Sequence, residues 1–469
     1  MDRHFAGVER DSGEPGVTTV SAPANPGVHA VRSSVYGPGV KLTAFGATDV
    51  GQARTHNEDH FLLDDELGLF VVCDGMGGHA SGEVASAMAA NSVRAVVKAE
   101  LGAIDAQKDE GRAADFVADV LKRSVEAANS SVHSHGKNAE AGRAAGTTCT
   151  ALCIRGNRGT LAHVGDSRLY LHRGGQTHLL SFDHSFLAEA IRRGIPREEA
   201  EQNFPPNLLS RAVGPLPRVQ VDTLEFDILP GDLFVLCSDG LHGYFESTDA
   251  VGALLNDDAA SLPERLVAFA NERGGADNIT AVVVCAGAAE AEEPARLSRV
   301  HEDLAALQTM ELFNELTYPE LLEVAAALGS EEHGPKHLLL REGETSRSLY
   351  VIASGSVEVR RGETLLAKLA SGSHFGEMAL LTNRPRSASV RTLEPCRLLT
   401  LDQDQIYPLF QQNPVIGLKF LWRLAQILSL RLDEATLFTS PIPDTERRAP
   451  EMIGTVTDEL FPPPFSKKV

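Results

Sequence analysis

The sequence predicts an α+β protein with two folded units, and three observations support this prediction. Residues 41–288 alternate strand-like apolar runs, bounded by Gly, Asp and Asn, with Ala-rich helical stretches. Residues 305–440 combine short strands and Gly-rich turns with one long amphipathic segment. The length of 469 residues is enough for about two to four domains of roughly 150 residues each.

In the first unit, helices should cover antiparallel sheets. Residues 61–74 predict a hairpin with a charged turn, and residues 148–175 predict several antiparallel strands separated by Gly-containing turns. The remaining elements are two helices followed by two apolar strands, at residues 82–101, 115–134, 232–239 and 277–287.

The second unit should be a small β-roll with flanking helices. Short strands separated by Gly-rich turns occupy residues 348–401, and residues 414–438 predict a long amphipathic helix. Residues 310–328 predict one further helix, with apolar side chains at Leu312, Leu316, Leu321, Leu322 and Val324. The other segments are a disordered tail, a partly helical acidic linker and a Pro-containing tail, at residues 1–40, 289–304 and 441–469.

The charge balance of 43 Lys and Arg against 64 Asp and Glu gives a formal net charge of −21. Such an acidic chain binds polyanions poorly, so neither nucleic acid nor a membrane surface is an expected partner. No apolar run approaches the roughly 18 residues of a membrane span, and the N-terminus lacks the apolar core of a signal peptide. We therefore expect a cytoplasmic protein.

The six cysteines have no CxxC spacing, and five of them lie in apolar, strand-like runs. This pattern favours reduced thiols in the core of a cytosolic protein. The alternative, a zinc or redox site, has no ligand spacing to support it.

Five short segments of the first unit place a carboxylate beside a turn or at a strand end: residues 54–59, 73–78, 164–168, 237–240 and 275–280. Strands that end in Asp would bring several carboxylate oxygens to the rim of a sheet, where they suit Mg²⁺ or Mn²⁺. The alternative for any single segment is ordinary turn chemistry, since Asp beside Gly or Asn is common in turns. The hypothesis of a metal centre therefore depends on all five together.

In order, these segments resemble the protein phosphatase 2C family of metal-dependent Ser/Thr phosphatases in its bacterial form. The blocks that carry the resemblance span residues 41–288 and are TDVGQARTHNED, VVCDGMGGHASGEVAS, AGTTCTALCI, AHVGDSRLYLHRGG, FDHS, LLSRAVG, GDLFVLCSDGL and GADNITAVVV. The resemblance implies a two-sheet β-sandwich flanked by helices, which agrees with the elements predicted above.

The resemblance also implies a role for each acidic segment. Asp74 would bridge two metal ions, with the Gly75 carbonyl on the second ion and Asp239 and Asp277 on the first. Asp166, together with Asp239, resembles a third metal site, so two or three Mn²⁺ or Mg²⁺ ions are expected. Residues that would hold metal-bound waters or orient a ligand are Glu58, Asp59 and Asn278, the last of which would orient Asp277.

By the same resemblance, Arg54 would bind the substrate phosphate, while the ions activate a water for in-line attack. Eukaryotic members carry a His two residues after the bridging Asp, and here that position is Met76. The general acid could be the nearby His79 or a metal-bound water, and a purely structural His79 is the alternative. Residues 183–214 resemble a flap that contacts protein substrates, although a flap without that role stays open.

The second unit contains one further motif, HFGEMALLTNRPRSASVRT, at residues 374–392. A Gly opens a short helical turn whose free N–H groups can face an anion, and an Arg follows that could pair with phosphate. The motif resembles the phosphate-binding cassette of cyclic nucleotide-binding domains, and residues 305–440 share the rest of that pattern. The implied ligand-lining residues are Gly376, Glu377, Arg386, Ser387 and Ala388. An ordinary turn in a β-roll is the alternative.

Ser387, directly after the Arg, is compatible with either cAMP or cGMP, so the identity of the nucleotide stays open. No helix-turn-helix pattern follows the last helix, and DNA binding is therefore not expected.

The function that we expect is hydrolysis of phosphoserine and phosphothreonine in substrates of Ser/Thr kinases, controlled by a cyclic nucleotide. The joint presence of Arg54, Asp74, Asp166, Asp239 and Asp277 favours an enzyme over a pseudophosphatase that only sequesters phosphoproteins. Two further alternatives are a sensor unit that binds no nucleotide and two units that are tethered without coupling.

Overall fold

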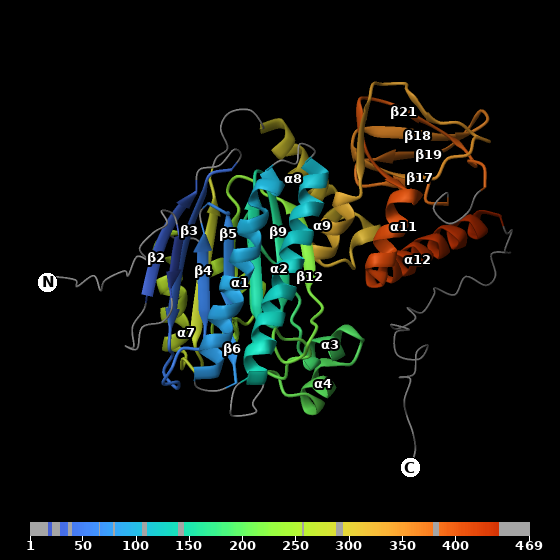
Figure 1. The fold of residues 1–469 in the computed structure, drawn as a ribbon. Coiled ribbons are helices and arrows are strands. Elements are labelled where there is room, and N and C mark those ends of the chain that lie inside the picture. Colours follow the sequence, from blue (N-terminus) through green and yellow to red (C-terminus); the bar gives the residue numbers. More distant parts are fainter. Residues whose placement is uncertain are drawn as a thin grey trace, which may run out of the picture.

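The computed structural model contains two folded units, a large sandwich and a smaller β-roll, with helices between them (Figure 1). It describes residues 17–20, 29–35, 40–64, 66–77, 80–105, 110–138, 145–255, 258–287, 294–378 and 384–439. The α+β fold class predicted from the sequence is confirmed: antiparallel sheets are covered by helices in the first unit, and a β-rich domain follows.

The first unit consists of two antiparallel sheets packed face to face (Figure 1). One sheet has the strand order β1 (Val17–Val20), β4 (His60–Asp64), β5 (Leu69–Cys73), β8 (Cys149–Arg155), β9 (Arg158–Val164) and β12 (Asp222–Asp227). The other has the order β11 (Gln176–Leu179), β10 (Arg168–Arg173), β13 (Leu233–Cys237), β14 (Ile279–Ala286), β3 (Leu42–Asp49) and β2 (His29–Val35).

A continuous apolar layer fills the space between the sheets. Phe61 and Phe70 from one sheet meet Phe234 and Val284 from the other, and all four are fully buried. Because both faces of each sheet are covered, strands such as β5 are apolar at every position rather than alternating. Burial of this layer is the main source of the free energy that holds the two sheets together.

Helices cover the two outer faces. The helices α1 (Ala80–Asp105) and α2 (Glu110–Asn138) pack on the sheet that contains β4 and β9. The helices α5 (Asp239–His242), α6 (Thr248–Leu254) and α7 (Leu262–Glu272) cover the other sheet. Two short helices, α3 (Phe186–Arg192) and α4 (Arg197–Asn203), form the segment predicted as a flap, and a small ladder joins β6 (Gly75–Met76) to β7 (Gly146–Thr147).

The second unit is a β-roll of two four-stranded sheets. The first sheet has the strand order β15 (Gly329–His333), β22 (Cys396–Asp402), β17 (Ser348–Ser354) and β20 (His374–Phe375). The second has the order β16 (Leu338–Leu340), β21 (Ser389–Thr392), β18 (Ser356–Arg361) and β19 (Thr364–Ala370). The helices α11 (Gln403–Gln412) and α12 (Pro414–Thr439) pack against the first of these sheets, and the turn η1 (Glu311–Phe313) joins the same apolar cluster.

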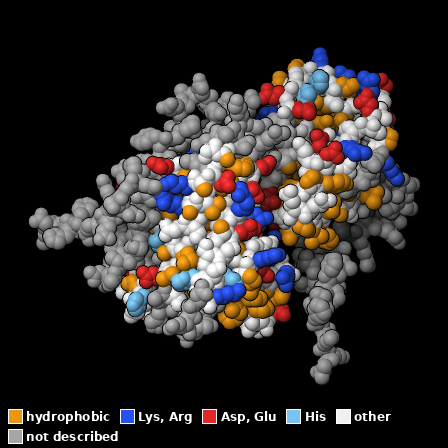
Figure 2. All heavy atoms as spheres, in the orientation of Figure 1, with side chains coloured by type: hydrophobic (Ala, Val, Ile, Leu, Met, Phe, Trp, Pro, Cys, Tyr) orange, Lys and Arg blue, Asp and Glu red, His pale blue; other side chains and the backbone are white. Residues whose placement is uncertain are grey.

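The helices α8 (Pro294–Thr309) and α9 (Tyr318–Ala326) lie between the two units (Figure 1). Leu304 and Leu322 join the apolar core of the sandwich, while Leu321 and Val324 join that of the second unit. Arg397 of β22 pairs with Glu302 and Asp303 on α8. Figure 2 shows charged side chains of both signs gathered along the seam between the units. The units therefore share packed elements rather than a loose tether.

The structure differs from two expectations about segments outside the core elements. We predicted a disordered tail over residues 1–40, but β1 and β2 pair as edge strands with β4 and β3. Most of the predicted linker 289–304 belongs to the helix α8. This helix packs on the sandwich, since the apolar side chain of Leu304 is buried in the sandwich core. Residues 441–469 lie outside the described residues.

The predicted helix 310–328 is interrupted, since a 3₁₀ turn at Glu311–Phe313 and the helix α9 replace it. The helix α9 begins at the capping residue Thr317, whose N–H donates to Glu320 Oε2 at 2.7 Å. Among the helices that the structure describes, none is both long and apolar enough to cross a membrane. All six cysteines are free thiols.

Candidate functional site

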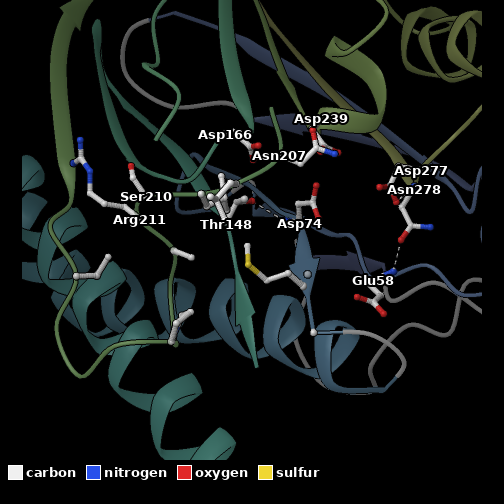
Figure 3. A pocket seen from close by; sticks show the side chains of 18 of the residues that line it. Glu58, Asp74, Thr148, Asp166, Asn207, Ser210, Arg211, Asp239, Asp277 and Asn278 are labelled. Carbon is white, nitrogen blue, oxygen red and sulfur yellow. Dashed lines mark hydrogen bonds between the residues drawn. The ribbon is translucent and has the colours of Figure 1, made fainter. Parts of the chain in front are cut away.

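A cavity of about 870 Å³ opens at one end of the sandwich, and it brings together most of the predicted site residues. Figure 3 shows Asp74, Asp239 and Asp277 on one side of this cavity, with Arg211 on the opposite side. The predicted residues that line it are Arg54, Glu58, Asp74, Gly75, Asp166, Asp239, Asp277 and Asn278. Asp59 is not part of the lining, because it is buried behind it with 3% of its surface exposed.

The antiparallel register explains why residues far apart in sequence meet here. Asp74 directly follows β5, and Asp166 follows β9, which runs in the same direction because β8 lies between them. In the opposing sheet, β13 ends beside Asp239 and its antiparallel neighbour β14 begins beside Asp277. Each carboxylate is therefore attached to the end of a rigid, buried strand.

Asp74 is held through its backbone. Its N–H donates to Thr148 Oγ1 at 2.8 Å, and its carbonyl accepts from the Thr148 N–H and the Thr147 hydroxyl, both at 2.8 Å. These contacts leave the carboxylate directed into the cavity (Figure 3). Beside it, a Cβ on Gly75 would lie 2.3 Å from Gly82 O and 2.5 Å from Glu58 O, so only glycine fits at this position.

Asp59 supports the site from behind the cavity wall. Its Oδ2 accepts from the hydroxyls of Ser238 and Thr280, both at 2.7 Å, while Oδ1 is buried without a hydrogen-bond partner within the described residues. Burial and the carboxylates of Asp239 and Asp277 raise the pKa of Asp59 to about 7. A buried, unpartnered carboxylate oxygen is costly, and a cation or its bound water would satisfy it.

Asp74, Asp166 and Asp239 show the same effect. Burial and the neighbouring carboxylates raise the pKa of Asp74 well above its usual range, and burial together with Asp239 raises the pKa of Asp166 to about 7. The pKa of Asp239 is also raised, first by burial and then by Asp277. Such a cluster favours either bound protons or bound cations.

The donor set consists of oxygens, which suits Mg²⁺ or Mn²⁺. Within the described residues, no three His, Cys, Asp or Glu side chains come together closely enough to enclose an ion by themselves. On the basis of its oxygen donors, we regard the cavity as a candidate metal centre.

Asn278 contacts Asp277 through its main chain, and its amide group has a further role. Instead of contacting Asp277 with its amide group, it braces the loop over residues 50–58, accepting from the Glu58 N–H and donating to the Val50 and His56 carbonyls. Its backbone N–H donates to Asp277 Oδ1 at 2.9 Å, so it does fix that carboxylate through the main chain.

Arg54 extends from the braced loop into the cavity. Its Nη2 donates to Asp277 Oδ2 at 2.6 Å, and 55% of its side chain is exposed. An exposed guanidinium held beside a carboxylate can pair with an anion that enters the cavity. Met76 also lines the cavity, whereas His79 lies outside the described residues.

Several supporting residues were not singled out from the sequence. Thr148 holds Asp74, and Ser238 and Thr280 hold Asp59, although each lies inside a motif that was quoted. Arg211, on the opposite wall, pairs with Asp222 at 2.6 Å. Thr148, Ser238 and Thr280 could have been recognised as hydroxyl residues within motifs that contain predicted site residues. No comparable sequence feature pointed to Arg211.

The predicted nucleotide site lies in the second unit. Arg386 is buried, and its guanidinium donates to Gly376 O at 3.1 Å, to Ser348 O at 2.7 Å and to the Ser346 hydroxyl. Glu377 is also buried, and Gly376 has a φ of +87°, a backbone conformation that favours glycine.

Ser387 is exposed at the surface and Ala388 is half-buried. Residues 379–383, the rest of the predicted helical turn, lie outside the described residues. The structure thus places the predicted Gly and Arg in direct contact.

Comparison with known families finds a match for each of the two units. Residues 51–282 match the family model for protein phosphatase 2C, and residues 331–413 match the model for the cyclic nucleotide-binding domain. The first match contains every predicted residue of the metal centre, and the second contains the predicted nucleotide site.

Curated relatives match the first unit over almost their whole length. Protein phosphatase PhpP of Streptococcus pneumoniae is 35% identical over 250 residues, which cover 52% of this chain and 98% of PhpP. Serine/threonine phosphatase stp of Listeria monocytogenes is 34% identical over 244 residues, which cover 50% of this chain and 93% of stp. Among solved structures, the Mycobacterium tuberculosis phosphatase PstP/Ppp is 31% identical, with 53% of this chain and 100% of PstP covered and a TM-score of 0.46.

The raised pKa values predict that metal binding depends on pH. Because the folded-state pKa values of Asp59 and Asp166 are about 7, above their unfolded values, these groups destabilise the metal-free fold increasingly as pH rises from about 4 to 7. Mn²⁺ competes with those protons, so its affinity should rise with pH in that range, up to about tenfold per unit for each proton displaced. Thermal unfolding with and without Mn²⁺ should show a larger increase in Tm at pH 8 than at pH 6. Equal increases at both pH values would contradict this account.

Proposed function

Since the chain belongs to the protein phosphatase 2C family, we propose that it hydrolyses phosphoserine and phosphothreonine in proteins, using two or three Mn²⁺ or Mg²⁺ ions. The observation that carries this proposal is the cavity at the end of the sandwich, where strand ends bring five carboxylates and Arg54 together. A cavity of about 870 Å³ is wide enough to admit a phosphorylated side chain from a protein surface.

Asp74, the Gly75 carbonyl, Asp239 and Asp277 would hold two ions, and Asp166 would share a third with Asp239. Bound there, the ions would supply a nucleophile at neutral pH and neutralise charge on the phosphoryl oxygens. Asp59 would act through its unpartnered Oδ1, which is fixed in direction by the Ser238 and Thr280 hydroxyls on Oδ2.

Arg54 would orient the phosphate. Its ion pair with Asp277 holds the guanidinium at the cavity wall, and its exposed N–H groups remain able to donate to two phosphoryl oxygens. The Asn278 brace keeps the loop that carries Arg54 in register with the acids. For the leaving alkoxide, His79 and a metal-bound water both remain candidate proton donors.

Asp239→Asn tests the metal centre. The substitution removes the charge of a ligand proposed to serve more than one ion, so kcat/KM for a phosphothreonine peptide in Mn²⁺ should fall at least about a hundredfold. Circular dichroism should show an intact fold, and the metal-free Tm should not fall, because carboxylate repulsion is relieved. Turnover near the wild-type value in saturating Mn²⁺ would refute the assignment.

Arg54→Ala tests the phosphate clamp. Loss of hydrogen bonds to a charged oxygen costs about 1.5–3 kcal/mol, so kcat/KM should fall roughly 10- to 150-fold with a raised KM. Mn²⁺ affinity, measured by calorimetry, should change little. Arg54→Lys should restore part of the loss, because it keeps the charge but not the bidentate geometry. A collapse of Mn²⁺ affinity with an unchanged KM would instead make Arg54 a structural residue.

For the second unit, the proposed ligand is a cyclic nucleotide, cAMP or cGMP, that changes phosphatase activity. Support comes from the family match and from the buried Arg386 beside Gly376. Because the guanidinium already donates to the Ser348 carbonyl and the Ser346 hydroxyl, an arriving phosphate would have to share or displace these contacts. Such an exchange would disturb β17, which carries Ser348 and packs against the helical core of this unit.

The helix α9 supports the proposed coupling, because it contacts both units. On the sandwich side, the Tyr318 ring stacks on His178 with a centroid distance of 3.7 Å, and its hydroxyl accepts from Arg173 at 3.3 Å. On the other side, Glu320 pairs with Lys419 of α12 at 2.7 Å, and Glu323 accepts from Asn413 at the junction of α11 and α12 at 3.4 Å. A movement of α12 would therefore act on α9 directly.

Arg386→Ala should abolish both nucleotide binding and the nucleotide response. Calorimetry with cAMP and with cGMP measures binding, and turnover of a phosphopeptide with and without saturating nucleotide measures the response. Coupling on the order of 1–3 kcal/mol would change the activity roughly 5- to 150-fold, with activation as the preferred sign. Tyr318→Ala should preserve binding but weaken the response, and the exposed Arg384→Ala serves as the matched control for Arg386. Unchanged turnover despite measured binding would leave two tethered units, the alternative to control.

A further inference from the structure

The wall of the catalytic cavity opposite the acids has features that the proposed hydrolysis does not use. It is formed by residues from the segment 207–220, and Figure 3 shows Ser210 and Arg211 on this side, across the cavity from Asp277. We propose that Leu216 and Arg218 on this wall select phosphoprotein segments with an apolar residue beside the phosphorylated one and an acidic residue farther along. This inference rests on the proposed phosphatase function and adds the class of substrate.

The turn that carries Leu216 is firmly anchored to the helix α2. Asn129 donates to Leu216 O at 3.0 Å and accepts from the Gly214 N–H at 2.7 Å, and His133 Nδ1 lies 2.8 Å from Gly214 O. Gly214 has a φ of +104°, and a Cβ there would lie 2.4 Å from Val132 Cγ1. The backbone of this turn is therefore held in place before any substrate arrives.

The same turn nevertheless presents a large apolar side chain to solvent. Leu216 is 65% exposed, and Leu208, which also lines the cavity, is 47% exposed. A single exposed Leu is ordinary on a protein surface, but these two flank one catalytic cavity. In the proposed arrangement, a peptide with its phosphate among the acids lies along this wall, because the wall and the acids line the same cavity. Burial of its apolar side chain against Leu216 would be favourable and would cost little ordering of the enzyme.

Positive charge on this wall provides a second basis for the selection of substrate segments. Arg54 and Arg211 line the cavity but are paired with Asp277 and Asp222. Arg218 also lines it, is exposed, and has no ion-pair partner within the described part of the chain. In a chain with a formal net charge of −21, a free cation at the cavity mouth is complementary to an acidic side chain of the substrate.

A set of synthetic phosphothreonine peptides tests the proposal with the full chain in Mn²⁺. The reference peptide has Leu on each side of the phosphothreonine and Glu two residues farther out on each side. One companion replaces both Leu residues with Ser, and another replaces both Glu residues with Lys. Wild-type kcat/KM should be about tenfold lower for the Ser peptide and about threefold lower for the Lys peptide.

The two variants should act on different peptides. Leu216→Ser should reduce the ratio between the Leu and Ser peptides to near one, while Arg218→Glu should invert the preference between the Glu and Lys peptides. Arg197→Glu is the matched control, because Arg197 is an exposed arginine of the flap that does not line the cavity, and it should keep the wild-type ratios. Ratios within one variant cancel any general loss of activity.

Several outcomes would overturn the inference. Equal kcat/KM for all three peptides in the wild type, together with hydrolysis of each, would refute selection while leaving the phosphatase function intact. A uniform rise for every peptide in Leu216→Ser would show that a segment of this chain, rather than substrate, covers the wall. Absence of hydrolysis for all peptides and for p-nitrophenyl phosphate would instead refute the proposed function, and this inference with it.

Discussion

The mutual repulsion of clustered carboxylates, of which Asp59 is buried and the others are partly buried, is the constraint on which the rest of the first unit depends. Asp59, Asp74, Asp166 and Asp239 all have raised pKa values, because burial and their neighbours disfavour the charged forms. A fold can contain such a cluster of carboxylates only if other interactions supply the free energy that keeps it folded. Here that free energy comes from the apolar layer between two six-stranded sheets and from the helices packed outside them.

The way in which the acids are attached follows from that constraint. None of the four Asp residues that line the cavity lies within a strand, and each lies within two residues of a strand end. The acids thus lie just outside the strand ladders, and a side-chain hydroxyl, that of Thr148, accepts from the Asp74 N–H. This separation lets the strongly unfavourable electrostatics of the site coexist with a regular sheet.

The sequence predicted much of this arrangement because the important residues lie in short motifs. The family resemblance named the acids of the candidate metal centre, and it named Gly376 and Arg386 as residues that line one site of the second unit. Contacts that depend on tertiary structure could not, such as the pairing of Arg211 with Asp222 or the Asn278 brace on the 50–58 loop.

Of two incorrect predictions, one could have been avoided from the sequence and the other could not. Thr317, Pro319 and Glu320 form the pattern of a helix start, and attention to it would have divided the predicted helix 310–328. By contrast, the edge strands β1 and β2 lie in a Gly- and Pro-rich region, and their pairing depends on open sheet edges that only the folded sandwich provides.

The position of α9 has a consequence for how the chain folds. Leu322 belongs to the core of the sandwich, and the adjacent Leu321 belongs to the core of the second unit. Neither core is therefore complete without a helix that the other also needs. A truncation that removed the second unit up to α9 would leave apolar surface of the sandwich exposed, and one that kept α9 alone would leave its other face unburied. The two units should accordingly melt as linked cooperative blocks, and the shortest stable fragment of the phosphatase should be longer than the family match suggests.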